Sequence, residues 1–347
     1  MSESRIKPTK LEDLAHILGV STVTVSKALR DHSDISDETK RKVKQLAEEM
    51  GYRPNMMARN LSSRKSNIIG IVVPKIAHFF FSSIIEAIYD TIIEKNYDSV
   101  IMVSQESAER EKQHLQSLIS MRVDGLIISI TEQTKDTSEF EKFMQMNIPM
   151  VFIDRVPNIP NVPSVTIDDK GGAFSAVEHF IQKGYRKIGL LGGYNYINIG
   201  KARNAGFYEA MNKYNVPVNN KWITEGGFSE ADGYKGFKKL MESGEIPQAI
   251  LAVTYPVALG MYEAAAEMGV KIPSDINVMC FGNNIYKYMA PSVFDFVSQP
   301  SEELGRSAVN LLMELLNDPN NVKEKNIELK TKLLLNGRKL VSSSTII

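Results

Sequence analysis

The sequence predicts a small three-helix head followed by a larger α/β body with two parallel sheets. Residues 9–51 hold three short helical segments with a glycine between the first two, and residues 68–281 alternate strand-like and helix-like segments in two series. Residues 1–65 contain 13 Lys and Arg against 9 Asp and Glu, a net charge of +4 that the remaining residues cancel. A basic head on an acidic body is typical of a polyanion-binding module fused to a second domain.

The composition is that of a globular protein. Of the 347 residues, 43% are hydrophobic and 24% are charged, which excludes a disordered, collagen-like or coiled-coil chain. The single cysteine, Cys280, excludes an internal disulfide framework and a cysteine-rich zinc site. No window approaches the ~18 consecutive apolar residues of a membrane span, and residues 1–5 do not open a signal peptide. We therefore expect a cytoplasmic protein without membrane contact.

The head has the spacing of a helix-turn-helix. Thr9 and Glu12 fit a capping box at the start of the first helix, and Gly19 is placed to end that helix with a positive φ. Ser21 is expected to cap a second helix and Ser36 a third. About three residues including a glycine then join the first two helices, as the motif requires. The expected inward-facing positions are Leu11, Leu14, Ala15, Leu18, Val25, Ala28, Leu29, Val43, Leu46, Ala47 and Met50.

The second helix has an outer face suited to DNA. Val23 is placed to meet a thymine methyl group, and Lys27 to donate to the O6 and N7 atoms of guanine. Ser21, Thr24 and the helix N-terminus suit phosphate contacts, which orient a protein without reading sequence. The alternative is a three-helix bundle that binds nothing, in which Thr24 and Ser26 are solvated helix residues. The DNA-contacting candidates of this helix are Ser21, Thr22, Val23, Thr24, Ser26, Lys27 and Arg30.

These residues resemble the head of the lactose/galactose-repressor (LacI/GalR) family of bacterial transcription regulators, and the similarity continues to the C-terminus. The matching stretches of the head are Leu11–Ala15, Gly19–Leu29, Ile35–Thr39 and Gly51–Asn55. The resemblance implies that Thr22, Val23 and Lys27 read the major groove. Lys27 stands where arginine is common; because lysine lacks the bidentate fork of arginine, looser readout is expected there.

Residues 55–61 match the family's hinge segment, with Asn55, Ala58 and Leu61 as expected DNA contacts. A segment of this length is not a stable helix alone, and the resemblance implies that it folds on operator DNA beside the same segment of a second subunit. Leu61 matches the leucine wedged into the minor groove, where it unstacks a base step and kinks the duplex. The alternative is that Leu61 is a linker residue packed on the body.

The body is expected to form two lobes of doubly wound parallel sheet. The β-branched run of residues 68–73 suits a buried parallel strand, and strand–helix alternation continues to residue 154. A second series begins after Pro163 and runs to residue 281. The resemblance implies a type I periplasmic-binding-protein-like body whose chain crosses three times between the lobes. Ligands of such sheets bind at the carboxyl ends of the strands.

The expected organisation has two domains. Residues 1–65 form the DNA-binding domain with its hinge, and residues 66–347 form the effector-binding and dimerisation domain. The first lobe is expected to take about residues 67–165 and 297–324, and the second about 166–295 and 325–340. The resemblance implies a homodimer, a two-fold protein matched to a two-fold operator, because the last residues carry no heptad like the tetramerising tail of one branch of the family.

The resemblance also implies where an effector binds. Phe80 and Phe81 fall in a stretch similar to the family's Pro-x-Ile-x-Asn-Pro-Phe-Phe, and Asp154 ends a strand as in the family. Arg203 matches the arginine that binds the effector. Phe228 lies where an aromatic ring commonly stacks on a sugar face.

Two departures from the family pattern change the expected ligand. Thr-Tyr-Pro replaces the usual Asn-Asp at 254–256, and Gly-Asn-Asn replaces a usual Asp at 282–284, so Tyr255 and Asn283 complete the candidate site. Acidic and amide groups at these positions usually hold sugar hydroxyls, so the pocket is expected to be more aromatic and less anionic. Two alternatives remain: a sugar or related metabolite, or a degenerate or non-sugar site.

Motifs for other chemistry are missing from the sequence. There is no P-loop, His-Glu-x-x-His or Gly-x-Ser-x-Gly, and the five histidines lack ligand spacing, so no enzyme activity, cofactor or metal is expected. Cys280 lies in an apolar strand, where an inert buried thiol is expected. The pair Asp168-Asp169 is expected to cap a helix rather than to act as paired acids. A solute-binding protein would share the body, but it would need export and would lack residues 9–65.

The sequence therefore predicts a sequence-specific homodimeric regulator, expected to repress a catabolic operon. Its expected partners are double-stranded operator DNA and a small molecule in the cleft between the lobes. That molecule would change the lobe angle by binding the DNA-competent and DNA-incompetent states with unequal affinity.

Leu61→Ala tests the hinge prediction. Loss of the wedge should weaken operator binding about tenfold or more, because the kinked duplex is no longer stabilised by the inserted side chain. Affinity is measured by titration of labelled duplex, and thermal unfolding of the body serves as the control. Unchanged operator affinity would exclude the wedge.

Overall fold

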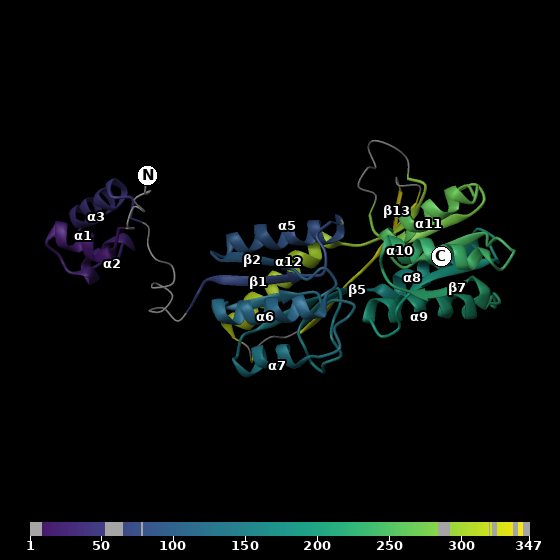
Figure 1. Ribbon diagram of the computed structural model, residues 1–347, viewed down its shortest axis with the longest axis horizontal. Helices are drawn as coiled ribbons and strands as arrows, with labels where there is room; N and C mark the ends of the chain where they lie inside the picture. Colours follow the sequence, from purple (N-terminus) through teal and green to yellow (C-terminus); the bar gives the residue numbers. More distant parts are fainter. Residues whose placement is uncertain are drawn as a thin grey trace, which may run out of the picture. The chain divides into compact units, whose positions relative to one another are not determined.

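The computed structural model describes residues 9–52, 65–77, 79–283, 292–318, 320 and 325–335, and the backbone of 339–342. The chain separates into two compact units, Met1–Ser66 and Asn67–Ile347 (Figure 1). The hinge positions Asn55, Ala58 and Leu61 lie outside the described residues.

The head contains the three expected helices: α1 (Leu11–Leu18), α2 (Thr22–Leu29) and α3 (Asp37–Glu49). Gly19 ends α1 with a φ of 65°. The predicted caps of the next two helices are confirmed: the Ser21 hydroxyl accepts from the Thr24 N–H at 3.1 Å, and the Ser36 hydroxyl from the Thr39 N–H at 3.3 Å. The core consists of Leu14, Ala15, Val25, Ala28, Val43 and Ala47, all buried.

The cap of α1 differs from the prediction. The Asp13 carboxylate, not that of Glu12, accepts from a backbone N–H at the helix start, that of Lys10 at 2.7 Å. The Thr9 hydroxyl instead donates to the Met50 carbonyl at 2.8 Å and so joins the start of α1 to the end of α3. A capping box shifted by one residue satisfies the same backbone groups, so tertiary packing selects between the two.

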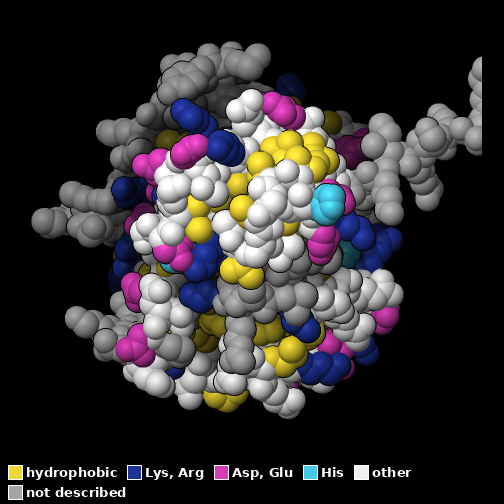
Figure 2. All heavy atoms as spheres, turned by 90° about the vertical axis from the view of Figure 1, so that its left-hand side faces the viewer, with side chains coloured by type: hydrophobic (Ala, Val, Ile, Leu, Met, Phe, Trp, Pro, Cys, Tyr) yellow, Lys and Arg dark blue, Asp and Glu magenta, His cyan; other side chains and the backbone are white. Residues whose placement is uncertain are grey.

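Charged side chains of both signs are interspersed on one face of the described part of the molecule. On the face drawn in Figure 2, Lys and Arg side chains lie in several separate groups with Asp and Glu side chains between them.

The first lobe is a six-stranded sheet covered on both faces. Its helices α5 (Phe79–Glu94) and α12 (Ser301–Asn317) cover one face, and α6 (Ala108–Met121) and α7 (Ser138–Gln145) the other (Figure 1). Alternation in the strand Ile68–Val73 follows from this layering: Ile69 and Ile71 pack toward α5 and α12, whereas Val72 packs toward α6 and α7. In spatial order the strands are β11 (Asn326–Leu329), β5 (Ser164–Ile167), β4 (Met150–Ile153), β3 (Gly125–Ile128), β1 (Ile68–Val73) and β2 (Asp98–Val103).

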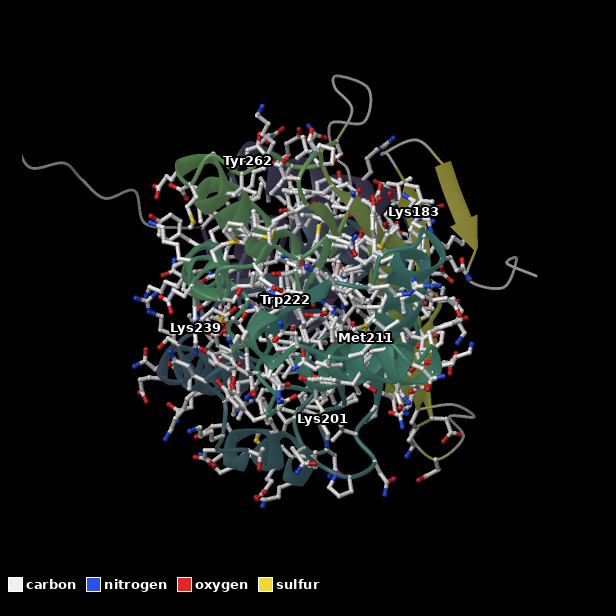
Figure 3. The ribbon with its side chains drawn as sticks, turned by 90° about the vertical axis from the view of Figure 1, so that its right-hand side faces the viewer. Lys183, Lys201, Met211, Trp222, Lys239 and Tyr262 are labelled. Carbon is white, nitrogen blue, oxygen red and sulfur yellow. The ribbon has the colours of Figure 1, made fainter. Side chains whose placement is uncertain are left out.

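The second lobe repeats this plan with seven strands. Helices α8 (Asp169–Gln182) and α9 (Asn198–Lys213) pack on one face, and α10 (Glu230–Met241) and α11 (Tyr255–Glu267) on the other. The short helix η1 (Asn220–Trp222) brings Trp222 into the core, near the centre of Figure 3, where it is buried. In spatial order the strands are β13 (Lys339–Ser342), β12 (Lys332–Leu335), β10 (Asp295–Ser298), β9 (Asn277–Phe281), β8 (Ala249–Ala252), β6 (Ile188–Gly193) and β7 (Ile223–Gly226).

The chain passes between the two sheets after β5, after β10 and after β11. One expected boundary differs from the structure. Residues 325–340 were expected in the second lobe, but β11 pairs in parallel with β5, with Ile327 opposite Val165, and so belongs to the first sheet. The last crossing is therefore the short connection from β11 to β12. Among the described residues, no helix is long and apolar enough to cross a membrane.

The crossing of α10 and α11 provides a stability prediction. A Cβ atom on Gly260 would lie 1.8 Å from the Glu230 carbonyl oxygen, a distance that no side chain tolerates. Gly260→Ala should destabilise the body by about 1–3 kcal/mol or more, since overpacking against a backbone exceeds the ~1 kcal/mol gained in helix propensity. Urea unfolding measures the change.

The matched control is Gly226→Ala, where the nearest atom to a new Cβ is 3.9 Å away. We expect the free energy of unfolding of this variant to lie within about 0.5 kcal/mol of that of the parent protein. Equal stability of the two variants would contradict the close approach of α10 and α11.

Candidate functional site

The candidate DNA-binding residues share the outward side of α2. Val23 has 61% of its surface exposed, and Ser21, Thr22 and Arg30 are also exposed, while Val25 on the opposite side is buried. The three remaining candidates on this side, Thr24, Ser26 and Lys27, are partly exposed.

Hydrogen bonds within α2 order several of these side chains. The Ser21 and Thr24 hydroxyl oxygens lie 2.9 Å apart. Arg30 donates from Nε to the Ser26 carbonyl at 3.1 Å and from Nη2 to the Ser26 hydroxyl at 3.2 Å. Ser26 therefore holds Arg30 against the helix.

Lys27 has an acidic partner that the sequence reasoning missed. Its Nζ lies 2.5 Å from Oδ2 of Asp34, and Oδ1 of Asp34 lies 2.7 Å from Nδ1 of His32. The hydrogen bond from Lys27, followed by that from His32, lowers the pKa of the Asp34 carboxyl. No helical spacing signals this pair, because Asp34 lies in the loop beyond α2.

The body has a pocket between its two lobes, with about 870 Å³ of space not filled by atoms, its opening to solvent included. All seven residues expected to bind an effector line it. Ligand pockets are typically concave and mostly apolar, with a few converging polar groups, and this pocket has that character. Its lining residues are Lys75, Phe79, Phe80, Phe81, Glu106, Glu132, Asp154, Arg155, Ile199, Arg203, Phe228, Ser229, Thr254, Tyr255, Pro256, Phe281, Gly282, Asn283 and Gln299.

Most of these residues follow the carboxyl ends of parallel strands. In the first lobe, Glu106, Glu132 and Asp154 come after β2, β3 and β4. In the second lobe, Phe228 and Thr254 come after β7 and β8. Because parallel strands end at one edge of a sheet, each lobe presents a row of side chains to the space between the lobes.

Arg203 is the most buried cation of the pocket, with 1% of its surface exposed. Its Nε donates to Oδ1 of Asp169 at 2.7 Å and its Nη1 to the Val253 carbonyl at 2.5 Å. The guanidinium carbon lies 3.9 Å from the centre of the Phe281 ring. The side chain is therefore fixed by α8, by the end of β8 and by β9.

The predicted role of the Asp168-Asp169 pair is correct for one member only. The Asp168 carboxylate caps α8 by accepting from the Gly171 N–H at 2.8 Å. Asp169 is instead buried and paired with Arg203. The sequence could not separate the two, since either residue can stand at the start of a helix.

Burial changes the acidity of two pocket carboxyls. Desolvation raises the pKa of Asp169 to about 7, although Arg203 acts in the opposite direction. Desolvation also raises the pKa of Asp154, which Arg155 and Arg203 partly offset. Asp154 has a φ of 58°, a left-handed conformation that aspartate adopts more readily than most residues.

Carboxylates on the first-lobe side were also missed. Nη1 of Arg155 donates to both Oε1 and Oε2 of Glu106 at 2.9 Å, and its guanidinium carbon lies 4.8 Å from the centre of the Phe228 ring. Burial raises the pKa of Glu132, and the nearby Glu106 charge adds to the effect. Three carboxylates and three cations therefore line the pocket, the cations being Lys75, Arg155 and Arg203. Glu106 and Glu132 follow the carboxyl ends of β2 and β3, and this position in the sequence could have identified them as pocket residues.

The replacements at 254–256 and 282–284 have separate structural roles. The Thr254 hydroxyl donates to the Phe228 carbonyl at 3.2 Å, and the Tyr255 ring packs 5.8 Å from that of Phe296. The Asn283 amide donates to the Gln299 carbonyl at 3.0 Å and accepts from the Ser298 hydroxyl at 2.6 Å. Asn283 lines the pocket while its amide holds the chain that crosses between lobes.

Groups that would indicate other chemistry do not gather in the part of the chain that the structure describes. No three His, Cys, Asp or Glu side chains among those residues could hold a metal ion. Cys280 is free and buried, and burial raises the pKa of its thiol well above the usual value.

Comparison with known proteins covers both units. Residues 66–334 match the family described as "Periplasmic binding proteins and sugar binding domain of LacI family", and residues 10–55 match "Bacterial regulatory proteins, lacI family". The HTH-type transcriptional repressor PurR of Haemophilus influenzae (strain PittEE) is 30% identical over 307 residues, 88% of this chain and 90% of that protein. Catabolite control protein A of Priestia megaterium is 29% identical over 306 residues, 88% and 92% of the two chains.

A solved structure extends the similarity over the whole architecture. The lac repressor dimer bound to operator and the anti-inducer ONPF is 26% identical, with a TM-score of 0.82 over 97% of this chain and 99% of that chain. The fold class predicted from the sequence, a helix-turn-helix head on a two-lobed periplasmic-binding-protein-like body, is thereby confirmed. The chain belongs to the LacI family of bacterial regulatory proteins.

Proposed function

We propose that this LacI-family DNA-binding regulator is a homodimeric repressor of a catabolic operon, and that a sugar or related metabolite in the interlobe pocket controls its affinity for DNA. The family consists of transcriptional regulators and not of enzymes. One observation carries the proposal: the seven residues expected to bind an effector line a single pocket, with contributions from both lobes.

The head would bind in the cytoplasm to operator DNA through α2. Thr22, Val23 and Lys27 would read base edges, and the helix N-terminus with Ser21 and Thr24 would contact phosphates. The exposure of Val23 supports this role, because an apolar group gains by leaving water for a thymine methyl. Asn55, Ala58 and Leu61 stay proposed as hinge contacts.

The first lobe offers a surface for a second copy of the chain. Tyr89 and Ile93 on α5 and Ile101 on β2 are 49%, 50% and 43% exposed. β2 is an edge strand of its sheet, and among the described residues no strand pairs with its outer side. The similar lac repressor was solved as a dimer on operator DNA, which supports a two-fold assembly here.

The chemistry of the pocket suits a hydroxylated ring. Carboxylates such as Asp154 and Glu132 accept hydrogen bonds from hydroxyl groups, Arg155 donates them, and the faces of Phe80 and Phe228 can stack on a ring. A ligand that touches both lobes binds the two lobe angles with unequal affinity, and this difference is what shifts DNA binding. The partly exposed ring of Tyr255 favours a second candidate, a flat non-sugar ring, in the same place.

Selection of duplexes from a random DNA library by the purified full-length protein tests the regulator. We expect enrichment of a two-fold symmetric site, near physiological salt because phosphate contacts make affinity salt-dependent. Repetition with cell extract detects a required co-repressor. Failure to enrich any site under both conditions would refute the proposed DNA reading.

Arg203 variants test the pocket. Arg203→Ala should abolish release from the selected operator by any sugar that stabilises the parent protein in a thermal-shift screen. It should also cost about 3–5 kcal/mol of stability, because Asp169 stays buried without its counter-charge.

The double variant Arg203→Met/Asp169→Leu separates the two effects. Replacing both charges by apolar side chains should restore most of the stability while the response to the sugar stays lost. A full response in the stable double variant would show that Arg203 does not bind the effector.

A further inference from the structure

The loop after the recognition helix α2 turns back along that helix. Asp31 adopts a φ of 53°, its N–H donates to the Ala28 carbonyl at 3.2 Å, and the His32 N–H donates to the Lys27 carbonyl at 3.1 Å. These bonds form the Schellman arrangement that ends many helices. The turn reverses the chain and so places Asp34 beside Lys27, seven residues earlier in the sequence.

Both oxygens of the Asp34 carboxylate are engaged. Oδ2 pairs with Nζ of Lys27 at 2.5 Å, and Oδ1 lies 2.7 Å from Nδ1 of His32. The carboxylate is thus oriented by two side chains rather than one. Lys27 is 35% exposed and Asp34 47% exposed, so solvent, or DNA, reaches both.

In the described part of the head, the other ion-paired lysines lie on a different element. Lys40 pairs with Asp37, Lys42 with Glu38 and Lys44 with Asp31, and all three lysines belong to α3. The Lys27 pair differs because its lysine is on the outward side of α2, at a position proposed to read a base. Asp34 is therefore the acid placed to influence that reading.

We propose that Asp34 is a positioning residue that orients the Lys27 ammonium for base readout and so sets the sequence specificity of the head. This inference rests on the proposed DNA-binding role of α2. Lysine is a point charge on a flexible stem, whereas arginine presents a rigid fork of donors. Asp34 occupies one of the three ammonium donors and restricts the stem, which leaves two donors for the O6 and N7 acceptors of a guanine.

The same carboxylate lowers binding to DNA in general. A negative charge beside the DNA-facing helix repels phosphates of every sequence equally, so it reduces non-specific affinity. Sequence specificity is the ratio of operator affinity to non-specific affinity, and Asp34 then acts on both affinities. It raises discrimination at one base pair and lowers the sequence-independent background.

Asp34→Asn is the direct test, with Asp31→Asn as its matched control. Both variants remove one negative charge from the same loop, but Asp31 pairs with Lys44 on α3 and not with Lys27. Asparagine also tolerates the left-handed conformation of residue 31. The full-length variants are titrated with the operator selected by the parent protein, with each single-base substitution of it, and with unrelated duplex.

We expect both variants to bind unrelated duplex about twofold more tightly, through the lost charge. Asp34→Asn alone should lose about five- to tenfold of the discrimination at one base pair of each half-site. In a Lys27→Ala background, Asp34→Asn should have no further effect on that base pair, because the residue it positions is gone.

Two results would overturn the proposal. If Asp34→Asn and Asp31→Asn discriminate equally against every single-base substitution of the operator, Asp34 contributes only its charge. If Asp34→Asn strengthens operator binding more than it strengthens unrelated duplex, Asp34 competes with DNA for Lys27. If the parent protein selects no operator, the proposed function fails first, and that result is distinct from either of these.

Discussion

The buried pair of Arg203 and Asp169 organises the second lobe around the pocket. One guanidinium joins the start of α8, the carbonyl of Val253 at the end of β8 and the ring of Phe281. Two opposite charges out of water are tolerated only when their geometry and hydrogen bonds are good, so the backbone near them has little freedom. One side chain thus ties together the elements that form this wall of the pocket.

On the first-lobe side of the pocket an arginine is also paired with a carboxylate, but this pair is less buried than that of Arg203 and Asp169. Arg155 is held by Glu106 on one side and faces Phe228 of the second lobe on the other. Each lobe thus presents one arginine whose partner acid comes from its own lobe. A carboxylate therefore fixes the position of the guanidinium on each side of the pocket, Glu106 for Arg155 and Asp169 for Arg203.

Sequence patterns predicted most of the fold because its elements follow local rules. The caps at Ser21 and Ser36 and the left-handed Gly19 depend on a few neighbouring residues, and the alternation of strands and helices depends on hydrophobic period. The place of β11 was missed, since its partner β5 is about 160 residues earlier and no local pattern encodes that pairing.

The candidate site was predicted where the family resemblance named a position, and was incomplete elsewhere. Glu106, Glu132 and Asp34 lie in loops whose course depends on tertiary structure. The sequence predicts a helix cap for both Asp168 and Asp169, because both stand at the start of a helix. Only the buried Arg203 beside Asp169 shows that the second residue has another role. Ion-pair partners that lie in loops are thus the hardest feature to predict from a single sequence.

The three passages of the chain between the sheets limit how the body can move. A single linker would let the lobes twist and slide, whereas three neighbouring connections leave mainly bending about the line that they define. The head is joined covalently to the first lobe alone, just before β1. If the proposed function holds, a signal from the second lobe reaches the head along the chain through the first lobe, and mutations that stiffen these connections are expected to weaken the proposed response without touching either ligand or DNA.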